Sequence, residues 1–448
     1  MLLRTKRPAR AGATIATIAL LAVLAAACTS VDTSSQTAVP MSVAGTSESG
    51  TSDAGSSSSS STVSSSAAPA PVALVTSSPQ LGDDALSPVE PVTITVAHGI
   101  ITALSVTNQE GAPVAGTLSP DRTSWTLGEP LGYDKTYSVS GTALGSDGLA
   151  VPIVGTYTTV TPVDEVTTSI SPGDGAVVGV AAPVIVHLGY EPADKDLIEK
   201  HVTITTTPHV EGAWAWIQHD GDNWPSLDWR PREYWPAGTV VHVASNVYGL
   251  PFGDGYFGGD NVASDFTIGR NQVVLADANA HNIAVQQNGV TVATYDASFG
   301  SGDEIGDPNR VTRSGIHVVS DMQETVKMSN PAYGYTNITE HWAVRISDNG
   351  EFIHQNQGTV DVQGVDNVSH GCINLSAESA EAYYASAIIG DPVVVTGTSV
   401  QLSAADGDVY DWTIPWETWL QMCGMAPAAS PPPLSRDALA RGSGARSG

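Results

Sequence analysis

Ser369-His370-Gly371-Cys372-Ile373-Asn374 is the stretch that decides how this chain is interpreted, and His354 lies 18 positions before Cys372. A cysteine needs a base before its thiolate can attack a carbonyl carbon. His354 and His370 are the nearest candidate bases. Gly371 adds no side-chain bulk, so the N–H groups of Gly371 and Cys372 could face a developing oxyanion. The stretch therefore predicts a cysteine enzyme that transfers acyl groups.

The two histidines are expected to have different roles. His354 ends an apolar run at residues 351–354 and is expected to act as the base. His370 would share a face with Cys372 on a strand, so we expect it to orient partners or line the site. A helix start near Ser376 would add positive charge close to Cys372. Zinc binding is the competing interpretation, but a zinc site usually has more ligands, so we expect no metal and no cofactor.

The unit that contains this stretch is expected to span residues 271–397 and to be mostly β with one main helix. Alternating runs at 282–287 and 290–294 flank Asn288-Gly289, which is a strong hairpin signal. Ser376 suits the N-cap of a helix over 377–389 that ends at Gly390. Further strands are expected at 315–319, 342–346, 352–354 and 393–396.

Two smaller units precede it. Short β-branched runs separated by Gly, Pro and Asp turns predict immunoglobulin-like β-sandwiches at residues 80–160 and 161–270, so the fold class is mainly β. A short helix is expected at 194–200. The second sandwich is rich in tryptophan, which indicates a core or a domain interface, with a sugar-stacking face as the alternative. These residues are Trp214, Trp216, Trp224, Trp229 and Trp235.

The two ends of the chain have other compositions. Residues 1–28 are predicted to be a lipoprotein signal peptide with a lipid on Cys28, because basic residues precede an apolar run that ends Leu24-Ala25-Ala26-Ala27-Cys28. Ordinary cleavage after the alanines is the alternative. Residues 29–79 are predicted to be a disordered Ser-rich tether with a span of roughly 40 Å. Residues 398–425 form a Trp-rich extension expected to pack back on the body, and 426–448 are expected to be disordered.

Charge and cysteine content restrict the partners. The chain has 18 Lys+Arg against 46 Asp+Glu, a net charge of −28, which argues against nucleic acid or an anionic membrane surface as a partner. Three cysteines predict no disulfide framework. Cys372 is expected to be free and Cys423 to be a buried apolar residue.

Together, His354, the fourteen residues that follow it and the stretch 369–374 resemble the signature of the L,D-transpeptidases (YkuD-type catalytic domain). Upstream, residues 235–239 and 266–270 resemble the actinobacterial lipoprotein members with two N-terminal immunoglobulin-like domains. The likeness covers residues 79–425. It implies an exported enzyme, anchored by lipid to the outer face of the plasma membrane, that forms 3→3 cross-links between peptidoglycan stem peptides with release of D-alanine. It also implies acylation by carbapenems.

The resemblance also implies roles for single residues. Cys372 would be the nucleophile and His354 the general base and acid. The backbone carbonyl of Gln355 would orient His354, and Asn374 would brace the loop. Ser369 belongs to the signature, and Met328 and Tyr335 would line the donor site, although Tyr335 could equally be a turn residue.

One segment departs from the family pattern, and other functions stay open. Residues 300–315 are acidic where the family often has Gly, Pro and Thr, so donor recognition by this loop is not implied. A cysteine peptidase or L,D-carboxypeptidase would share the Cys372–His354 step and use water as acceptor. A non-catalytic cell-wall binding scaffold is the third possibility.

Overall fold

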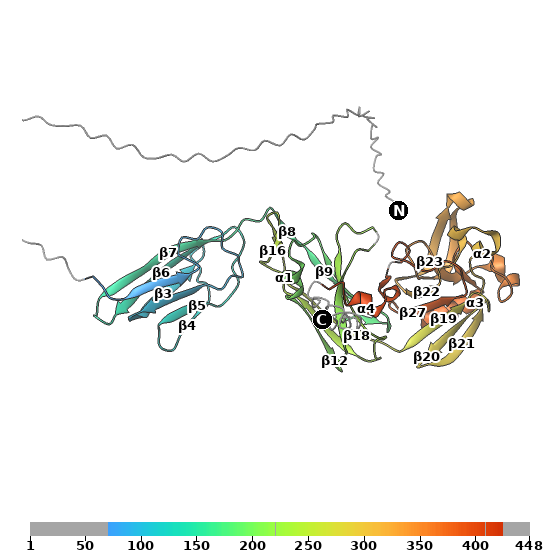
Figure 1. Ribbon diagram of the computed structural model, residues 1–448, viewed down its shortest axis with the longest axis horizontal. Coiled ribbons are helices and arrows are strands. Elements are labelled where there is room, and N and C mark those ends of the chain that lie inside the picture. Colours follow the sequence, from blue (N-terminus) through green and yellow to red (C-terminus); the bar gives the residue numbers. More distant parts are fainter. Residues whose placement is uncertain (1–69, 220, 408, 424–448) are drawn as a thin grey trace, which may run out of the picture. The chain divides into compact units, whose positions relative to one another are not determined.

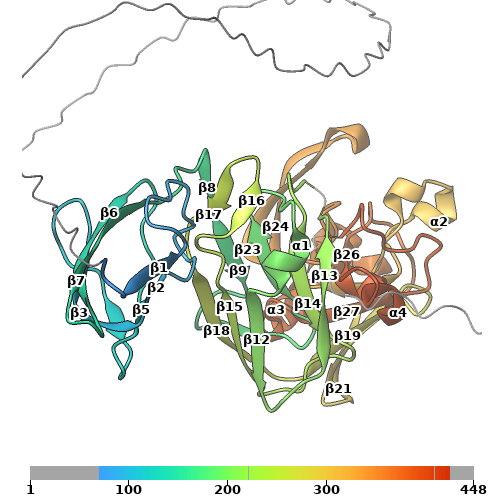
Figure 2. The same cartoon turned by 60° about the vertical axis from the view of Figure 1, so that its left-hand side comes forward.

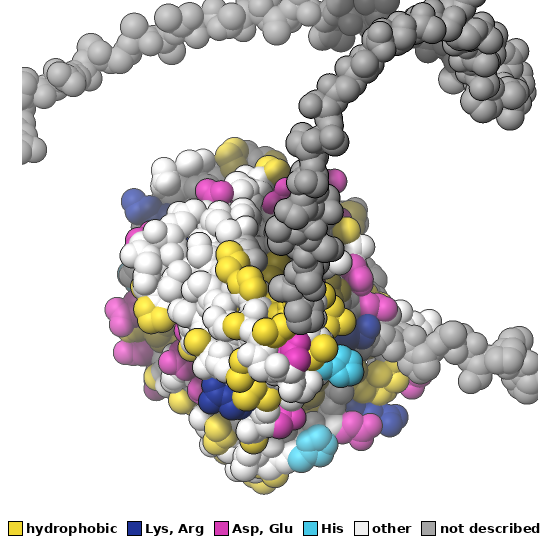
Figure 3. Space-filling model, turned by 90° about the vertical axis from the view of Figure 1, so that its left-hand side faces the viewer, with side chains coloured by type: hydrophobic (Ala, Val, Ile, Leu, Met, Phe, Trp, Pro, Cys, Tyr) yellow, Lys and Arg dark blue, Asp and Glu magenta, His cyan; other side chains and the backbone are white. Residues whose placement is uncertain are grey.

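The computed structural model describes residues 70–219, 221–407 and 409–423, and this part of the chain is mainly β, as predicted. The predicted signal peptide with Cys28, the predicted tether up to residue 69 and the predicted C-terminal tail from residue 426 lie outside the described residues. The first sandwich begins earlier than the expected residue 80, because β1 (Leu74–Ser78), in the last part of the predicted tether, pairs with one of its strands. No helix in the described ranges is both long and apolar enough to cross a bilayer. Acidic side chains are scattered over the face drawn in Figure 3 and do not gather in one patch.

The first sandwich consists of two facing sheets (Figure 1). One sheet has the order β1 (Leu74–Ser78), β2 (Thr93–Ala97), β5 (Ser124–Leu127), β4 (Gly116–Leu118). The other has the order β3 (Gly99–Thr107), β6 (Thr136–Gly145), β7 (Ala150–Thr158). Alternate residues such as Ile94, Val96 and Val139 are buried between the sheets, which is the period-two pattern visible in the sequence.

The second sandwich is larger (Figure 2). One of its two main sheets has the order β13 (Gly212–Ile217), β14 (Ser226–Pro231), β11 (Val184–Leu188), β9 (Thr168–Ser171). The other has the order β10 (Val177–Val178), β18 (Val262–Ile268), β15 (Val240–Ser245), β12 (Val202–Thr207). A small third sheet has the order β16 (Pro251–Gly253), β17 (Tyr256–Gly258), β8 (Asp164–Val166). The predicted short helix is α1 (Lys195–Glu199), and its N-cap Asp194 accepts a hydrogen bond from the Leu197 N–H.

The tryptophans of this sandwich serve mainly as core. Trp216, Trp229 and Trp235 are buried in its hydrophobic cluster, which confirms the core interpretation for them. Trp224 is 38% exposed and instead packs against Tyr190 with the two rings tilted by 47°.

The C-terminal extension packs back on the second sandwich, as predicted. It contains η4 (Asp411–Thr413) and α4 (Trp416–Trp419). Trp419 is fully buried with Ala215 and Ile217 of β13, and its indole N–H donates to the Ala213 carbonyl at 2.9 Å. Cys423 is not the buried apolar residue that was expected: it is half-exposed, and its thiol contacts the Glu199 carboxylate.

The third unit has two sheets around one core. The first is ordered β21 (Val290–Asp296), β20 (Asn282–Gln287), β19 (Gln272–Asp277), β27 (Pro392–Thr396), β22 (Gly315–Val318). The second is ordered β23 (Asp321–Asn330), β24 (Tyr335–Arg345), β25 (Phe352–Gln355), β26 (Ile373–Leu375). The predicted hairpin joins β20 to β21, and positive φ angles at Asn288 and Gly289 explain why this pair stands there. Short helical turns, α2 (Gly302–Ile305), η1 (Pro308–Arg310), η2 (Pro331–Tyr333) and η3 (Gln357–Val362), lie in its loops.

The main helix, α3 (Ala377–Ser386), packs against β24 and β25. Ser376 caps it as predicted, accepting from the Ser379 N–H. The helix ends at Ser386 and not at Ile389, so the predicted end is wrong. The backbone groups needed for another turn are taken: the Arg270 guanidinium donates to the Ser386 carbonyl, and the Asp391 carboxylate accepts from the Ile388 N–H.

Candidate active site

Cys372 and His354 are brought together by a parallel strand pair. Cys372 directly precedes β26, which runs parallel to β25 with Ile353 opposite Ile373 and His354 opposite Asn374. Asn374 therefore lies directly beside His354 in the strand pair, and Cys372 comes immediately before that pair. This register places a loop cysteine next to a strand histidine, which the sequence spacing alone does not reveal.

His354 is almost fully buried and is held on its far side. Its Nδ1 lies 2.7 Å from the carbonyl oxygen of Gln355, the contact expected for that residue, and 3.5 Å from a Glu340 carboxylate oxygen. Burial by itself lowers the pKa of His354, but hydrogen bonds to the Cys372 side chain and to Glu340 outweigh it and raise the pKa to about 10. The ring and the thiol line the same cavity, and the charge of each influences the other.

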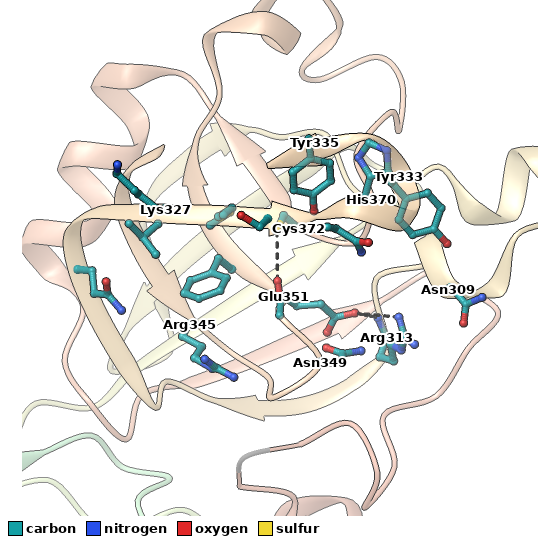
Figure 4. Close-up of a pocket in the computed structure, with 17 residues that line it drawn as sticks. Asn309, Arg313, Lys327, Tyr333, Tyr335, Arg345, Asn349, Glu351, His370 and Cys372 are labelled. Atoms are coloured by element: carbon teal, nitrogen blue, oxygen red, sulfur yellow. Dashed lines mark hydrogen bonds and ion pairs between the residues drawn. The ribbon is translucent and has the colours of Figure 1, made fainter. Parts of the chain in front are cut away.

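The Cys372 thiol is free and half-exposed. It lies 3.5 Å from the Gly350 carbonyl oxygen, a contact marked by the dashed line from Cys372 in Figure 4. The positive charge expected beside Cys372 from the start of a helix is not present there. The strand β26 separates Cys372 from α3, a distance of roughly 13 Å along an extended chain, and a helix terminus acts only over about one turn.

The backbone around Gly371 differs from the expected oxyanion arrangement. Gly371 has φ of +125°, a conformation that favours glycine. Its N–H is already used, because it donates to the Ser369 hydroxyl at 3.1 Å, and that hydroxyl donates to the Cys372 carbonyl at 2.5 Å. The Cys372 N–H makes no hydrogen bond within the described residues. Of the two expected donors, only Cys372 is therefore available in this arrangement.

The acidic segment 300–315 supports this loop from behind. The Ser301 N–H donates to the Ser369 carbonyl at 3.0 Å, and the Arg310 guanidinium lies 3.3 Å from the same oxygen. The Thr312 hydroxyl donates to the Gly371 carbonyl at 2.7 Å. The segment therefore holds the cysteine loop through serine, arginine and threonine side chains and backbone groups.

His370 lies on a bend and not on a strand, because β26 begins only at Ile373. The face-sharing argument therefore does not apply to it. Its ring packs against Tyr333 and Tyr335, with centroids 5.1 and 5.4 Å away, as the labelled side chains in Figure 4 show. Burial, and then the charge of the Cys372 sulfur, raise the pKa of Tyr335, which places this tyrosine close to the thiol.

Two cavities meet at Cys372. The larger, about 510 Å³, includes Arg313, Lys327 and Glu351 in its wall. The smaller, about 250 Å³, includes Glu340 and His354. Met328, Tyr335, His370 and Cys372 line both, whereas Ser369 and Asn374 line only the smaller one. These six candidate residues therefore lie around the same pair of cavities.

Sequence reasoning missed several residues of the site. Glu351 is buried beside the larger cavity, where it accepts from the Arg313 N–H at 3.0 Å and from the Ser347 hydroxyl at 3.1 Å. Burial raises the pKa of Glu351 despite the opposing charges of His317 and Arg313. A carboxylate at the start of an apolar strand was the available signal for Glu351. No local pattern marks Glu340.

Cys372, His354 and His370 do not form a group with metal-ligand spacing in the described part of the chain. The group with such spacing is His219, Asp228 and Asp411, which belongs to the second sandwich and the C-terminal extension.

The chain is similar to known proteins over most of its length. The model of the bacterial Ig domain matches residues 83–251, across both sandwiches, and the model of the L,D-transpeptidase catalytic domain matches residues 271–395. L,D-transpeptidase 5 of Mycobacterium tuberculosis (strain ATCC 25618 / H37Rv) is 47% identical over 81% of this chain and 80% of its own length. L,D-transpeptidase 2 of Mycobacterium tuberculosis (strain CDC 1551 / Oshkosh) is 37% identical over 73% of this chain and 79% of its own. A solved L,D-transpeptidase in complex with imipenem is 31% identical, covers 52% of this chain and all of its own, and has a TM-score of 0.42.

The matches define a class of protein in which a bacterial Ig region precedes an L,D-transpeptidase catalytic domain, and they confirm the predicted fold class. The chain belongs to the L,D-transpeptidase family.

Proposed function

We propose that this chain cross-links peptidoglycan stem peptides with Cys372 as nucleophile and His354 as proton carrier. The observation that carries the proposal is the placement of the His354 ring. The ring is buried, it is fixed through Nδ1 by the Gln355 carbonyl, and it lines the same cavity as the Cys372 thiol. A base oriented by a third group beside a nucleophile is the arrangement that covalent catalysis requires.

The reaction would run in two balanced steps. The Cys372 sulfur attacks the carbonyl carbon of the third residue of a tetrapeptide donor, and the bond to D-alanine breaks. His354 gives its proton to the departing amine. The side-chain amine of the third residue of a second stem then attacks the thioester and loses its proton to His354. The Cys372 sulfur leaves, and a 3→3 cross-link remains.

The oxyanion of each step would be held mainly by the Cys372 N–H. This donor is unengaged within the described residues, whereas the Gly371 N–H would first have to leave the Ser369 hydroxyl. We assign Gly371 the role of allowing the loop conformation, and Ser369 the role of fixing it. Asn374 would line the acceptor side, and His370 would position Tyr335.

The pair of cavities supports transfer to an amine over hydrolysis. The larger cavity carries Lys327, which suits a carboxylate of a donor stem, whereas Arg313 in the same wall is already paired with Glu351 and Asp406. The smaller cavity carries His354 and Glu340, where an incoming amine would meet its base. A hydrolase needs no second cavity of this size, because water is its acceptor.

The proposed site of action is the cell envelope, in keeping with an Ig region ahead of the catalytic domain. We propose export through the signal at residues 1–28 and a lipid on Cys28, with the Ser-rich residues ahead of β1 as a tether. The tether would carry a body of two Ig-like units (from β1 to 160, and 161–270), the catalytic unit (271–397) and the extension (398–425). Mass spectrometry of the mature N-terminus tests the anchor, and an unmodified Cys28 contradicts it.

Intact mass after exposure to a carbapenem tests the nucleophile. The wild type should gain one adduct, and the Cys372→Ala variant should gain none. The Cys423→Ala variant keeps the proposed nucleophile and should also gain one adduct. Incubation with disaccharide-tetrapeptide then tests the reaction. A cross-linked dimer with released D-alanine supports transpeptidation. Tripeptide without dimer would show an L,D-carboxypeptidase, and no product change on Cys372→Ala would show a scaffold.

A further inference from the structure

Strand β14 is buried on both faces, although only one of them belongs to the sandwich core. Leu227 and Trp229 face that core. The alternate residues Ser226, Asp228 and Arg230 are polar and also buried, and they face the C-terminal extension. The extension therefore covers a polar surface, and each buried polar group there needs a partner.

A histidine and two aspartates meet under this cover. His219, in the loop after β13, is 7% exposed, and Asp228 of β14 and Asp411 of η4 are fully buried. The ligand atoms that the three offer all lie within 4.8 Å of one another. His219 Nε2 lies 2.8 Å from Asp228 Oδ2, and the ring of His219 packs edge-on against Tyr410.

Asp411 lacks a hydrogen-bond donor. Neither of its carboxylate oxygens accepts a hydrogen bond from any of the described residues. Asp228, its neighbour in the cluster, offers a second carboxylate and no donor, since its oxygens already face Ser226 and His219. An ionised carboxylate buried without a partner costs several kcal/mol, roughly, so this arrangement requires a cation or a shared proton.

Arg230 is the nearest guanidinium, but its hydrogen bonds go elsewhere. Its Nη2 donates to the Ile414 carbonyl at 2.8 Å and its Nη1 lies 3.3 Å from the Pro231 carbonyl. Its plane stacks among indole rings of the extension, with centroids 4.6 to 5.2 Å from the guanidinium carbon; these are Trp412, Trp416 and Trp419. The charge of Arg230 reaches Asp411 without a hydrogen bond.

We propose that His219, Asp228 and Asp411 bind one divalent transition-metal ion, for which zinc is the best fit. Zinc takes imidazole nitrogen and carboxylate oxygen at about 2.0–2.2 Å, so ligand atoms around it lie roughly 3.4 Å apart. To reach that geometry, the widest separation of 4.8 Å would shorten by about 1.4 Å, and the 2.8 Å contact between His219 and Asp228 would lengthen by about 0.6 Å. The imidazole nitrogen disfavours calcium and magnesium, which prefer oxygen ligands.

The ion would join three segments that are distant in sequence: the loop after β13, strand β14 and the extension at η4. Its binding energy would therefore add to the stability of the second sandwich with its extension, and it would play no part in the chemistry at Cys372. The sequence does not reveal this cluster, because no two of its residues have the short spacing of a metal motif.

Metal content and thermal unfolding test the proposal on the full chain, purified without a polyhistidine tag. We expect elemental analysis by inductively coupled plasma mass spectrometry to find about one zinc per chain. A chelator should lower the melting temperature, and adding back Zn²⁺ or Mn²⁺ alone should restore it. The Asp411→Asn and His219→Gln variants should lose the ion and the chelator effect. Asp222→Asn, which removes a nearby exposed carboxylate outside the cluster, should keep both.

The contrary result is distinct for each readout. The proposal is wrong if the purified chain holds no ion, neither Zn²⁺ nor Mn²⁺ raises its melting temperature, and the Asp411→Asn variant melts at or above the wild type. In that case a shared proton holds the carboxyl groups of Asp228 and Asp411 together. Equal zinc binding by all variants would also overturn it. Should the variants not fold, chelation and metal addition on the wild type decide alone.

Discussion

The hydroxyl of Thr312 donates a 2.7 Å hydrogen bond to the carbonyl oxygen of Gly371, the residue directly before Cys372. The same hydroxyl accepts from the Gly300 N–H at 2.9 Å, and the Thr312 side chain is fully buried. One side chain thus links the 300–315 segment to the peptide that carries the proposed nucleophile.

Replacing Thr312 with valine keeps the shape of the side chain and deletes both hydrogen bonds. We expect a loss of about 1–3 kcal/mol in the free energy of unfolding, because two buried backbone groups lose their partner. Carbapenem acylation should slow by about tenfold or more, since the loop that positions Cys372 loosens. Urea unfolding and adduct formation over time measure the two effects. The exposed Thr294→Val change should alter neither, and an acylation rate equal to that of this control would contradict the proposed link.

Glu340 contributes to the raised pKa of His354 and should therefore set the alkaline limit of acylation. Glu340→Gln removes a negative charge 3.5 Å from the ring, so the pKa of His354 falls from about 10 toward its ordinary value. The alkaline limb of the pH–rate profile should move down by about one pH unit. Carbapenem acylation between pH 6 and pH 11 measures it, with the exposed Glu324→Gln on the same hairpin as control. A reduced rate with an unmoved limb would show that Glu340 acts only in packing.

The same shift has a consequence for stability. The pKa of His354 is about 10 in the folded chain and about 6.5 in the unfolded chain, so protonated His354 stabilises the fold. This stabilisation is fully present below about pH 6.5 and is lost as the pH rises toward 10. The Glu340→Gln variant should therefore lose less stability between pH 7 and pH 10 than the wild type.

Local signals explain why much of this fold could be predicted. The Asn288-Gly289 hairpin, the Ser376 cap and the strand ending near His354 each depend on a few adjacent residues. A candidate nucleophile and a candidate base could be proposed because cysteine and histidine have few roles in such a spacing. Turn chemistry and capping act over a handful of residues, which a single sequence displays completely.

The remaining features depend on register and on distant segments. Whether the Gly371 N–H is free depends on the rotamer of Ser369, and Thr312 reaches the loop only through the folded 300–315 segment. The end of α3 is set by Arg270, more than a hundred positions away. No periodicity encodes such contacts, so the sequence could predict the residues of the site but not the hydrogen bonds that hold them.

Arg270 should be a strong stabiliser of the catalytic unit. Its guanidinium pairs with the fully buried Asp391 at 2.8 Å, and Gln272 lies 3.4 Å from the same carboxylate oxygen. Arg270→Gln leaves a buried carboxylate without its charge partner, so we expect a loss of about 3–5 kcal/mol in the free energy of unfolding. Urea unfolding followed by circular dichroism measures it. The exposed Arg232→Gln change removes the same charge and should cost less than about 0.5 kcal/mol. Equal stability of the two variants would mean that Asp391 is neutral in the fold.

Trp419 should hold the C-terminal extension in place. Its ring is fully buried against Ala215 and Ile217, and its N–H donates to a β13 carbonyl. Trp419→Ala removes this packing and leaves the Ala213 carbonyl without a donor, so a loss of about 3–5 kcal/mol is expected. Protease digestion should then release the extension early. The adjacent Leu420 is 43% exposed, so Leu420→Ala changes the same helix without opening the core and should digest like the wild type. If both variants digest alike, the extension is held by contacts other than Trp419.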